Sequence, residues 1–151
     1  MISTLQQERY AYRPKLPAVF AQNGPFVTVQ EGARTTALAD AAAIEKAFPR
    51  TYGRPELTFA AGARRAAAPL RVGVILSGGQ APGGHNVIAG LFDGLKAVHP
   101  DSELIGFLGG PSGLTDNKHR VLDAAAIDAY RNTGGFDMIG SGRTKLEKTE
   151  Q

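Results

Sequence analysis

The feature that most constrains the fold is a strand, a glycine-rich turn and a helix in direct succession over residues 70–98. The run "LRVGVIL" (70–76) is typical of a buried strand, because it is short, apolar and rich in β-branched residues. The turn "SGGQAPGGHN" (77–86) follows. Apolar residues then recur at helical spacing: Val87, Ile88, Leu91, Phe92, Leu95 and Val98. Pro100 ends that pattern, so we expect a helix over 86–98.

The same alternation continues downstream. "ELIGFL" (103–108) reads as a second strand, and "GGPSGLTD" (109–116) reads as a second glycine-rich turn. "AAAIDAYRN" (124–132) favours a short helix. "FDMIG" (136–140) favours a third strand, with "SGRTK" (141–145) as its exit loop. Strands that alternate with helices predict the α/β class, with a parallel sheet and crossover helices.

The first residues of the chain predict an arm that precedes this sheet. "STLQQER" can open a short helix, with Ser3 as the N-cap and Gln6 at the capping-box position. Pro14 and Pro17 then favour extended backbone.

Residues 26–69 predict a short alternating segment, a helix, a strand and a linker. The alternating segment is "FVTVQEG", and the helix covers residues 36–48, ended by Pro49. "ELTFA" is a possible strand, and "AGARRAAAP" (61–69) is a small-residue linker. We therefore expect an N-terminal extension over 1–68 and the first, incomplete portion of an α/β domain over 69–151.

Composition narrows the function classes. The chain has 151 residues, of which 42% are hydrophobic and 21% charged, as in a globular protein. It has no cysteine, which excludes disulfides, thiolate zinc sites and cysteine catalysis. The net charge is +3, but the Lys and Arg residues are scattered and aromatics are only 7%, which disfavours nucleic-acid binding. No apolar run approaches the roughly 20 residues of a membrane span, and no secretory signal is present, so we expect a cytoplasmic protein.

The turn after the first strand is a candidate anion site. Ligands of open α/β sheets bind at the carboxyl ends of the strands. Gly78 and Gly79 leave the backbone bare there, and a helix that Asn86 can cap begins behind them. The alternative is a tight turn that binds nothing. The turn matches neither the Walker pattern nor the dinucleotide pattern G-x-G-x-x-G.

Two further turns leave the same edge of the predicted sheet. For "GGPSGL" (109–114), a surface loop is favoured over direct ligand contact. "GSGRTK" (140–145) places Arg143 and Lys145 toward the same crevice as the two glycines. A guanidinium can bind two phosphate oxygens at once, so a phosphate contact is favoured over a solvated loop.

The histidines and carboxylates indicate no metal centre. His85 could hydrogen-bond a ligand, and it could equally stabilise its own loop. No His pair has metal-ligand spacing, and no paired carboxylates form an evident magnesium site or general base. The residues alone therefore predict a phosphate-binding α/β unit and no particular reaction.

The stretch "GVILSGGQAPGGHNVIAGLFDGL" resembles the phosphofructokinases, and more narrowly their long, pyrophosphate-dependent form. "LQQERYAYRPKLP", "FPRTYGRPELTF", "GFLGGPSGL" and "YRNTGGFDMIGSGRTKLE" also fit that form, so the resemblance covers nearly the whole chain. It implies a Rossmann-like three-layer αβα fold with an N-terminal helical arm. It also implies a reversible, Mg²⁺-dependent transfer of a phosphoryl group from pyrophosphate to the 1-hydroxyl of fructose 6-phosphate, a step of glycolysis.

Carried over by motif, Gly78, Gly79 and Arg143 match the residues that bind the phosphoryl donor, and Lys145 is a weaker candidate. Gln80 stands where the ATP-dependent enzymes usually have Asp, as expected for the pyrophosphate form. The family's "GGDD" and "TIDGD" aspartate motifs do not occur in these residues. No catalytic or metal-binding residue is therefore assigned, and we expect these residues to be an N-terminal part that is inactive alone.

Two alternatives remain open. The chain could come from a non-catalytic relative that only binds a phosphate ligand or assembles with a partner. It could also be an unrelated phosphate-binding module. The resemblance implies a homo-oligomer, often a dimer, with pyrophosphate and fructose 6-phosphate as its small-molecule partners.

Overall fold

The computed structural model describes residues 2–79 and 82–147. It consists of two compact units: Met1–Lys15 with Ala66–Gln151 in the first, and Leu16–Arg65 in the second. Gln80, which the sequence singles out, lies outside the described residues. The domain boundary expected after residue 68 stays a prediction.

The first unit contains a small mixed sheet, which makes the fold α/β as predicted. Strand β3 (Arg71–Val74) pairs in parallel with β4 (Glu103–Phe107), so that Val72 lies opposite Leu104. Helix α4 (Gly84–Val98) forms the crossover between these two strands. The third strand, β5 (His119–Val121), runs antiparallel to β4. The expectation of an all-parallel sheet is therefore wrong for the described residues.

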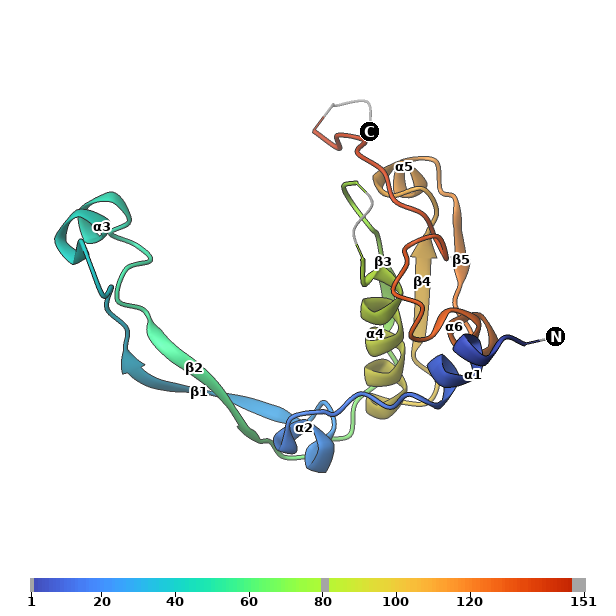
Figure 1. Ribbon diagram of the computed structural model, residues 1–151, viewed down its shortest axis with the longest axis horizontal. Coiled ribbons are helices and arrows are strands. Elements are labelled where there is room, and N and C mark those ends of the chain that lie inside the picture. Colours follow the sequence, from blue (N-terminus) through green and yellow to red (C-terminus); the bar gives the residue numbers. More distant parts are fainter. Residues whose placement is uncertain (1, 80–81, 148–151) are drawn as a thin grey trace. The chain divides into compact units, whose positions relative to one another are not determined.

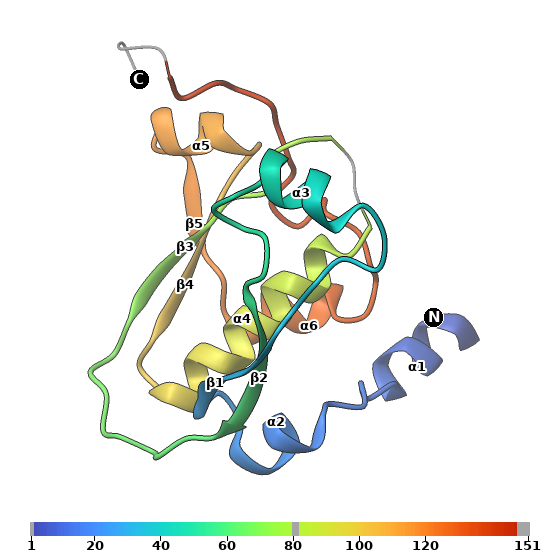
Figure 2. The same cartoon turned by 90° about the vertical axis from the view of Figure 1, so that its left-hand side faces the viewer.

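Helices α4 and α6 (Ala124–Tyr130) lie on the same side of this sheet, as Figure 2 shows. Their apolar side chains meet those of the strands in one core: Val74, Ile88, Ala89, Phe92, Leu95, Leu104, Leu122, Ile127, Met138 and Ile139. Burying such side chains contributes about 1.5–3 kcal/mol each before the cost of chain ordering, so this core holds the sheet and both helices together.

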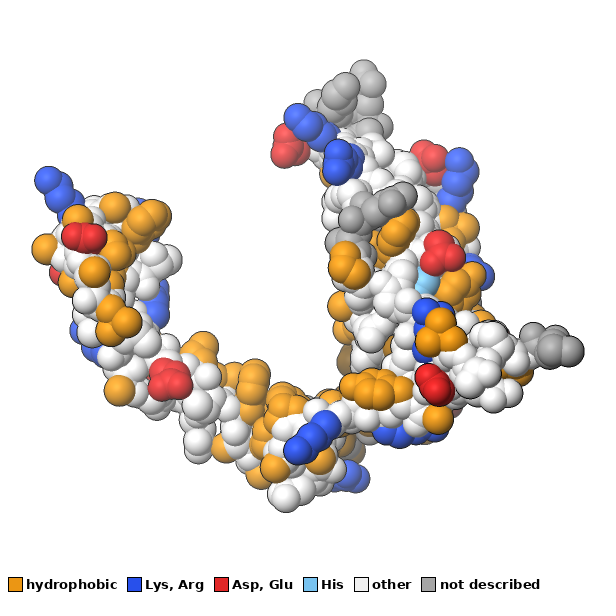
Figure 3. Space-filling view, viewed as in Figure 1, with side chains coloured by type: hydrophobic (Ala, Val, Ile, Leu, Met, Phe, Trp, Pro, Cys, Tyr) orange, Lys and Arg blue, Asp and Glu red, His pale blue; other side chains and the backbone are white. Residues whose placement is uncertain are grey.

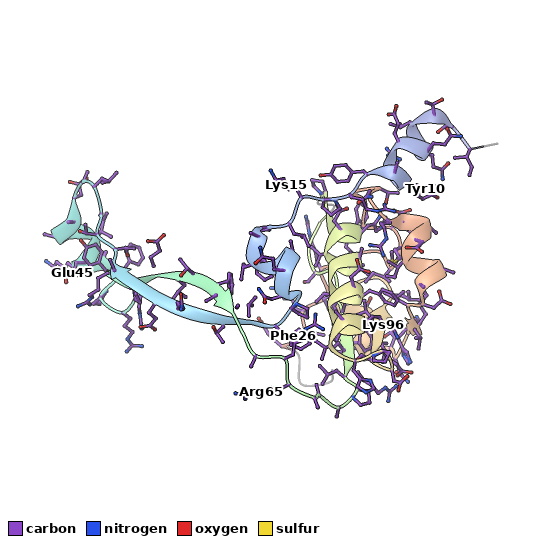
Figure 4. The ribbon with its side chains drawn as sticks, turned by 90° about the horizontal axis from the view of Figure 1, so that it is seen from below. Tyr10, Lys15, Phe26, Glu45, Arg65 and Lys96 are labelled. Atoms are coloured by element: carbon purple, nitrogen blue, oxygen red, sulfur yellow. The ribbon has the colours of Figure 1, made fainter. Side chains whose placement is uncertain are left out.

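Helix α4 follows the predicted apolar stripe only in part. Ile88, Phe92 and Leu95 are buried, whereas Val87 and Leu91 are exposed. At the C-terminal end, Lys96 Nζ donates to the carbonyls of Pro100 and Ser102 at 2.8 and 2.7 Å, which satisfies groups just beyond the helix (Figure 4).

The start of α4 corrects one expectation. The N-cap is Gly83, with a φ of 98°, and the helix begins at Gly84. Asn86 lies inside the helix and does not cap it. Glycine suits this N-cap because a side chain is strained at positive φ.

The third strand expected at 136–140 is wrong. This segment forms turns, because its backbone groups are already bonded locally: Gly140 N–H donates to Phe136 O at 3.0 Å. Only Gly142, further along, pairs in parallel with Ser77. The expected turn at 109–116 likewise contains a short helix, α5 (Pro111–Thr115).

The N-terminal helix, α1 (Thr4–Ala11), confirms the short helix predicted at the start of the chain. Ser3 caps it by accepting the N–H of Gln6 at 3.2 Å. The Gln6 side chain donates to Tyr10 OH rather than returning to Ser3, so the capping box is half formed. Asn132 Nδ2, in the loop after α6, donates to the carbonyls of Arg9 and Tyr12 at 2.9 and 3.2 Å, which attaches α1 to the rest of the first unit.

The second unit is an antiparallel hairpin of β1 (Val27–Arg34) and β2 (Pro55–Ala61). The possible strand at "ELTFA" is confirmed, and the alternating segment "FVTVQEG" forms its partner strand. Helix α3 (Ala41–Ala47) stands between them and is shorter than expected, because Asp40 before it has a φ of 52°. Helix α2 (Ala18–Asn23) was not predicted.

One face of the hairpin is apolar. Val29 lies opposite Phe59, and Phe59 packs edge-on against Phe20 of α2 with ring centroids 5.3 Å apart. Val29, Leu57 and Phe59 are each more than half exposed, and Figure 3 shows hydrophobic side chains along this unit. Across the described parts of the chain, no helix is both long and apolar enough to cross a membrane.

Candidate functional site

Three glycine-bearing loops meet at the carboxyl ends of β3 and β4. The loop 76–79 is held against Gly142, which donates its N–H to Leu76 O at 3.3 Å and accepts the N–H of Gly78 at 2.8 Å. The loop after β4 joins them, since Gly109 N–H donates to Ile139 O at 2.8 Å. The sequence therefore placed all three loops at one edge of the sheet correctly.

Glycine is required where these loops touch. A Cβ atom on Gly110 would fall on the backbone nitrogen of Gly142 and lie 3.0 Å from Leu76 O. A Cβ atom on Gly142 would in turn fall on Gly109 O. Gly110 and Pro111 are buried, so the second loop supports the other two and does not lie free on the surface.

The third loop brings Arg143 onto the first. A Cβ atom built on Gly79 would lie only 2.5 Å from Nη2 of Arg143 and 3.5 Å from its Cζ. The Arg143 side chain is exposed, so the guanidinium can reach a ligand beside the Gly79 backbone. Arginine stays protonated and presents a planar set of donors that matches phosphate oxygens. The predicted convergence of these two residues is thus present in the structure.

The backbone N–H groups of the site are partly used by the protein itself. Gly78 donates to Gly142 O, Gly83 donates to Gly134 O at 2.6 Å, and the backbone of His85 donates to Gly135 O at 2.8 Å. Gly79 N–H has no backbone acceptor among the described residues. Fewer N–H groups at the start of α4 face outward than the turn motif predicts.

Lys145 is exposed two residues beyond Arg143. Within the described ranges, the structure gives no hydrogen bond or ion pair from Lys145, and it does not bring this side chain onto Gly78 or Gly79. Of the two basic candidates, Arg143 is the one that lies beside the described part of the glycine turn.

His85 is the second residue of α4 and is 1% exposed. Its Nδ1 is 2.6 Å from Thr133 Oγ1, and its Nε2 accepts the backbone N–H of Met138 at 2.9 Å. Its ring meets that of Tyr130 edge-on, with centroids 4.7 Å apart. Burial lowers the pKa of His85, and the Asp137 carboxylate, 3.2 Å from Nε2, partly opposes that shift. Of the two predicted roles of His85, ligand contact and loop stabilisation, these contacts support loop stabilisation.

A charge cluster that the sequence did not reveal joins α4 to the end of α6. Arg131 donates two hydrogen bonds to Asp93, at 2.8 and 3.0 Å, and one to Asp128 at 2.9 Å. These bonds raise the pKa of Arg131 further above its usual value. The two aspartates were uninformative because they lie 35 positions apart in the chain and carry no motif.

The described residues contain no arrangement that supports magnesium binding. Over 2–79 and 82–147, no group of three or more His, Cys, Asp or Glu side chains is arranged to hold a metal ion. Asp93 and Asp128 are committed to Arg131. No step that involves Mg²⁺ is assigned to the side chains of these described residues.

Comparison with known proteins finds relatives that are similar over nearly the whole chain. No protein-family model matches the chain. Over 99% of its length, it is 59% identical to the pyrophosphate–fructose 6-phosphate 1-phosphotransferase of Porphyromonas gingivalis and 53% identical to that of Treponema pallidum. It is 42% identical, over the same share, to the enzyme of that name from Entamoeba histolytica.

These relatives are much longer than the chain, which spans 27% or 28% of their length. The similarity nevertheless covers both units, including the glycine turn and the loop that carries Arg143. Identity of 42–59% over such a length is far above chance. Over nearly its whole length, the chain is therefore homologous to part of the pyrophosphate–fructose 6-phosphate 1-phosphotransferases.

Proposed function

We propose that the protein transfers a phosphoryl group from pyrophosphate to the 1-hydroxyl of fructose 6-phosphate, reversibly, to give fructose 1,6-bisphosphate and orthophosphate. The observation that carries the proposal is the position of the Arg143 guanidinium beside the Gly79 backbone, at the carboxyl edge of the sheet. The names of the relatives supply the substrates. Because the chain spans about a quarter of those proteins, the activity is proposed for the protein at its full native length.

The part of the reaction that these residues can perform is binding of the donor. Phosphoryl transfer depends mainly on positioning and on positive charge near the equatorial oxygens of the transferred group. Arg143 supplies a fixed positive charge and two or more N–H donors, and Gly79 supplies an N–H with no backbone acceptor among the described residues. Gly78 contributes by shape, since its own N–H is bonded to Gly142. Lys145 stays a weaker candidate.

The reaction needs more than this chain provides. Mg²⁺, the cofactor that the resemblance implies, would neutralise charge on the pyrophosphate oxygens. We propose that its ligands and the general base lie in the parts of the protein that correspond to the rest of its longer relatives. The 151-residue chain alone is then expected to be inactive.

The proposal also covers the complete fold of the protein and its assembly into oligomers. The sheet face opposite α4 and α6 carries Ile105, Phe107 and Val121, and a second helical layer on that face would complete the three-layer αβα fold. Relatives from Arabidopsis thaliana are named as alpha and beta subunits. We propose a homo-oligomer, a dimer in its simplest form, that acts in the cytoplasm.

The test is an assay of the full-length protein with fructose 6-phosphate, Mg²⁺ and either pyrophosphate or ATP, followed by phosphorus NMR. We expect fructose 1,6-bisphosphate to form with pyrophosphate, and the reverse reaction to regenerate pyrophosphate from the bisphosphate and orthophosphate. Binding of pyrophosphate without any transfer would favour a non-catalytic relative instead. Transfer from ATP alone would contradict the choice of donor.

A further inference from the structure

His85 makes three hydrogen bonds to one short segment, and each uses a different group. Its backbone N–H donates to Gly135 O at 2.8 Å. Its Nε2 accepts the N–H of Met138 at 2.9 Å, and its Nδ1 lies 2.6 Å from Thr133 Oγ1. The segment 133–138 is therefore wrapped around one buried imidazole.

The directions of these bonds assign the tautomer. A backbone N–H can only donate, so Nε2 is the acceptor from Met138 and carries no proton. The proton is then on Nδ1 and is donated to Thr133 Oγ1, whose own hydroxyl proton goes to Tyr130 O at 2.6 Å. Both ring nitrogens are occupied by the protein, so the ring has no free group for a ligand or for proton transfer.

The backbone beside the ring is fitted to it. A Cβ atom on Gly135 would lie 2.9 Å from Cε1 of His85 and 3.2 Å from its Nδ1, so only glycine lets the segment lie this close. The edge-on Tyr130 ring closes another side. In this conformation the segment satisfies both ring nitrogens.

The anchored segment leads directly to Arg143. Met138 is bonded to the ring, Ile139 O accepts the N–H of Gly109, and Gly142 pairs with the loop 76–79. These later hydrogen bonds are made by backbone groups, so His85 supplies the side-chain hydrogen bond nearest to the start of the loop among the described residues. The buried side chains of Met138 and Ile139 anchor the same stretch by packing in the core. A shift at Met138 would be transmitted along five residues to Arg143.

We propose that His85 is a positioning residue, which holds residues 133–138 so that the guanidinium of Arg143 lies beside Gly79. The effects on the KM for pyrophosphate that this proposal predicts rest on the proposed function. It assigns His85 no contact with substrate, and it predicts that the ring acts on the donor site only through Arg143.

Two substitutions separate the two ring nitrogens. The amide nitrogen of His85→Asn can take the place of Nδ1 and keep the bond to Thr133, but it loses Met138. The amide oxygen of His85→Gln can take the place of Nε2 and keep the bond to Met138, but it loses Thr133. We expect H85N to raise the KM for pyrophosphate about tenfold and H85Q to raise it less than about threefold, because small displacements of a binding group are costly.

The full-length protein is assayed with each substrate varied in turn, below the unfolding temperature of each variant. We expect the KM for fructose 6-phosphate to stay within about twofold in both variants. A purely structural role would lower the active fraction, and hence kcat, by similar factors in both variants, while the KM for pyrophosphate stayed unchanged. That result would overturn the proposal. His119→Gln, at an exposed position of β5, is the matched control and should leave all constants unchanged.

A double-mutant cycle tests the route through Arg143. If His85 acts through that side chain, H85N in an Arg143→Ala background should raise the KM for pyrophosphate by less than about twofold. A second full tenfold increase would show an independent action of His85 and contradict the proposal.

Hydrogen exchange gives a readout that does not require activity. We expect the amides of residues 138–143 to exchange about tenfold or more faster in H85N and to change little in H85Q. Unchanged exchange in H85N would overturn the positioning role, whatever the enzyme does. Absence of phosphoryl transfer by the wild-type protein, with the exchange result as expected, would instead contradict only the proposed function.

Discussion

The guanidinium of Arg143 occupies the space that a side chain on Gly79 would need, with Nη2 only 2.5 Å from the ideal Cβ position. The two residues lie 64 positions apart in the chain and leave the sheet from different loops. Glycine at 79 is therefore explained by the arginine that covers it. The same contact places a positive charge beside a backbone N–H that has no backbone acceptor among the described residues.

Gly79→Ala should weaken donor binding with little loss of stability. The new methyl group would displace the guanidinium, but Gly79 is exposed and its φ is not in the left-handed region. We expect the KM for pyrophosphate to rise about fivefold to tenfold in the full-length protein, with a change of less than about 0.5 kcal/mol in the free energy of unfolding.

Gly90→Ala is the matched control, because Gly90 lies exposed within α4 with no atom near the added Cβ. It should stabilise the protein by about 0.5–1 kcal/mol and leave the KM unchanged. An unaltered KM in Gly79→Ala would mean that the arginine can move aside without loss of binding.

Arg143 should resist replacement even by lysine. Lysine keeps the charge but cannot bind two oxygens in the plane of a fork, so the bidentate contact would be lost. We expect the KM for pyrophosphate to rise about tenfold in Arg143→Lys, which loses one charge-assisted hydrogen bond to the donor. We expect it to rise about a hundredfold in Arg143→Ala, which loses two such bonds. Lys145→Ala serves as the comparison and should have less than about a threefold effect. If Lys145→Ala were the more damaging change, the two residues would have to exchange roles.

The sequence was sufficient for the elements that form from local pattern. The β3–α4–β4 unit and α6 were predicted from apolar periodicity, and α1 from its cap at Ser3. These elements depend on residues close together in the chain. The meeting of Gly79 and Arg143 was also predicted, but from a third parallel strand at 136–140 that the structure does not contain. The pairing of Gly142 with the loop 76–79 brings the two residues together instead.

The sequence failed where tertiary contacts decide the structure. Residues 136–140 have strand-like composition, but the Met138 N–H is bonded to His85, from a helix 53 positions away. β5 has only three residues, all of them on the exposed side of the burial range, so it carries no apolar alternation to detect. The Arg131 cluster likewise depends on packing between α4 and α6. The start of α4 at Gly84 depends on hydrogen bonds to the carbonyls of Gly134 and Gly135, which lie far along the chain.

Gly110→Ala should destabilise the whole edge of the sheet. Gly110 has a φ of 79°, and its added Cβ would collide with the Gly142 backbone, which cannot move without releasing Gly78. We expect a loss of about 2–4 kcal/mol in the free energy of unfolding, measured by denaturant titration. A loss below about 0.5 kcal/mol would show that the three loops are not packed against one another as described.

Arg131→Ala should loosen the attachment of α6 to α4. The side chain is about a quarter exposed and Asp93 is more than half exposed, so solvent screens much of the charge attraction. We expect a loss of about 1–2 kcal/mol on thermal unfolding, with Arg131→Lys intermediate because it keeps one bond to Asp93. The KM for pyrophosphate should not change. Equal stability of all three proteins would mean that the cluster contributes nothing measurable.

Acidification should destabilise the protein through His85. Burial lowers its folded-state pKa below the unfolded value of about 6.5, so near and below that pH the unfolded chain binds the additional proton. The contribution of the neutral ring to stability is therefore fully present above about pH 6.5. It is lost as the pH falls through the lowered folded-state pKa.

The Asp137 carboxylate faces the ring and moderates this shift, and the Tyr130 ring packs edge-on against it. His85→Gln removes the titrating group and keeps an acceptor for Met138. We therefore expect the free energy of unfolding to fall less steeply between about pH 7 and about pH 5 in H85Q than in the wild type, whereas His119→Gln keeps the wild-type slope. If the free energy of unfolding depended on pH identically in the wild type and in H85Q, the proton uptake would occur at other groups. The His85 ring would then have the same pKa in the folded and the unfolded chain.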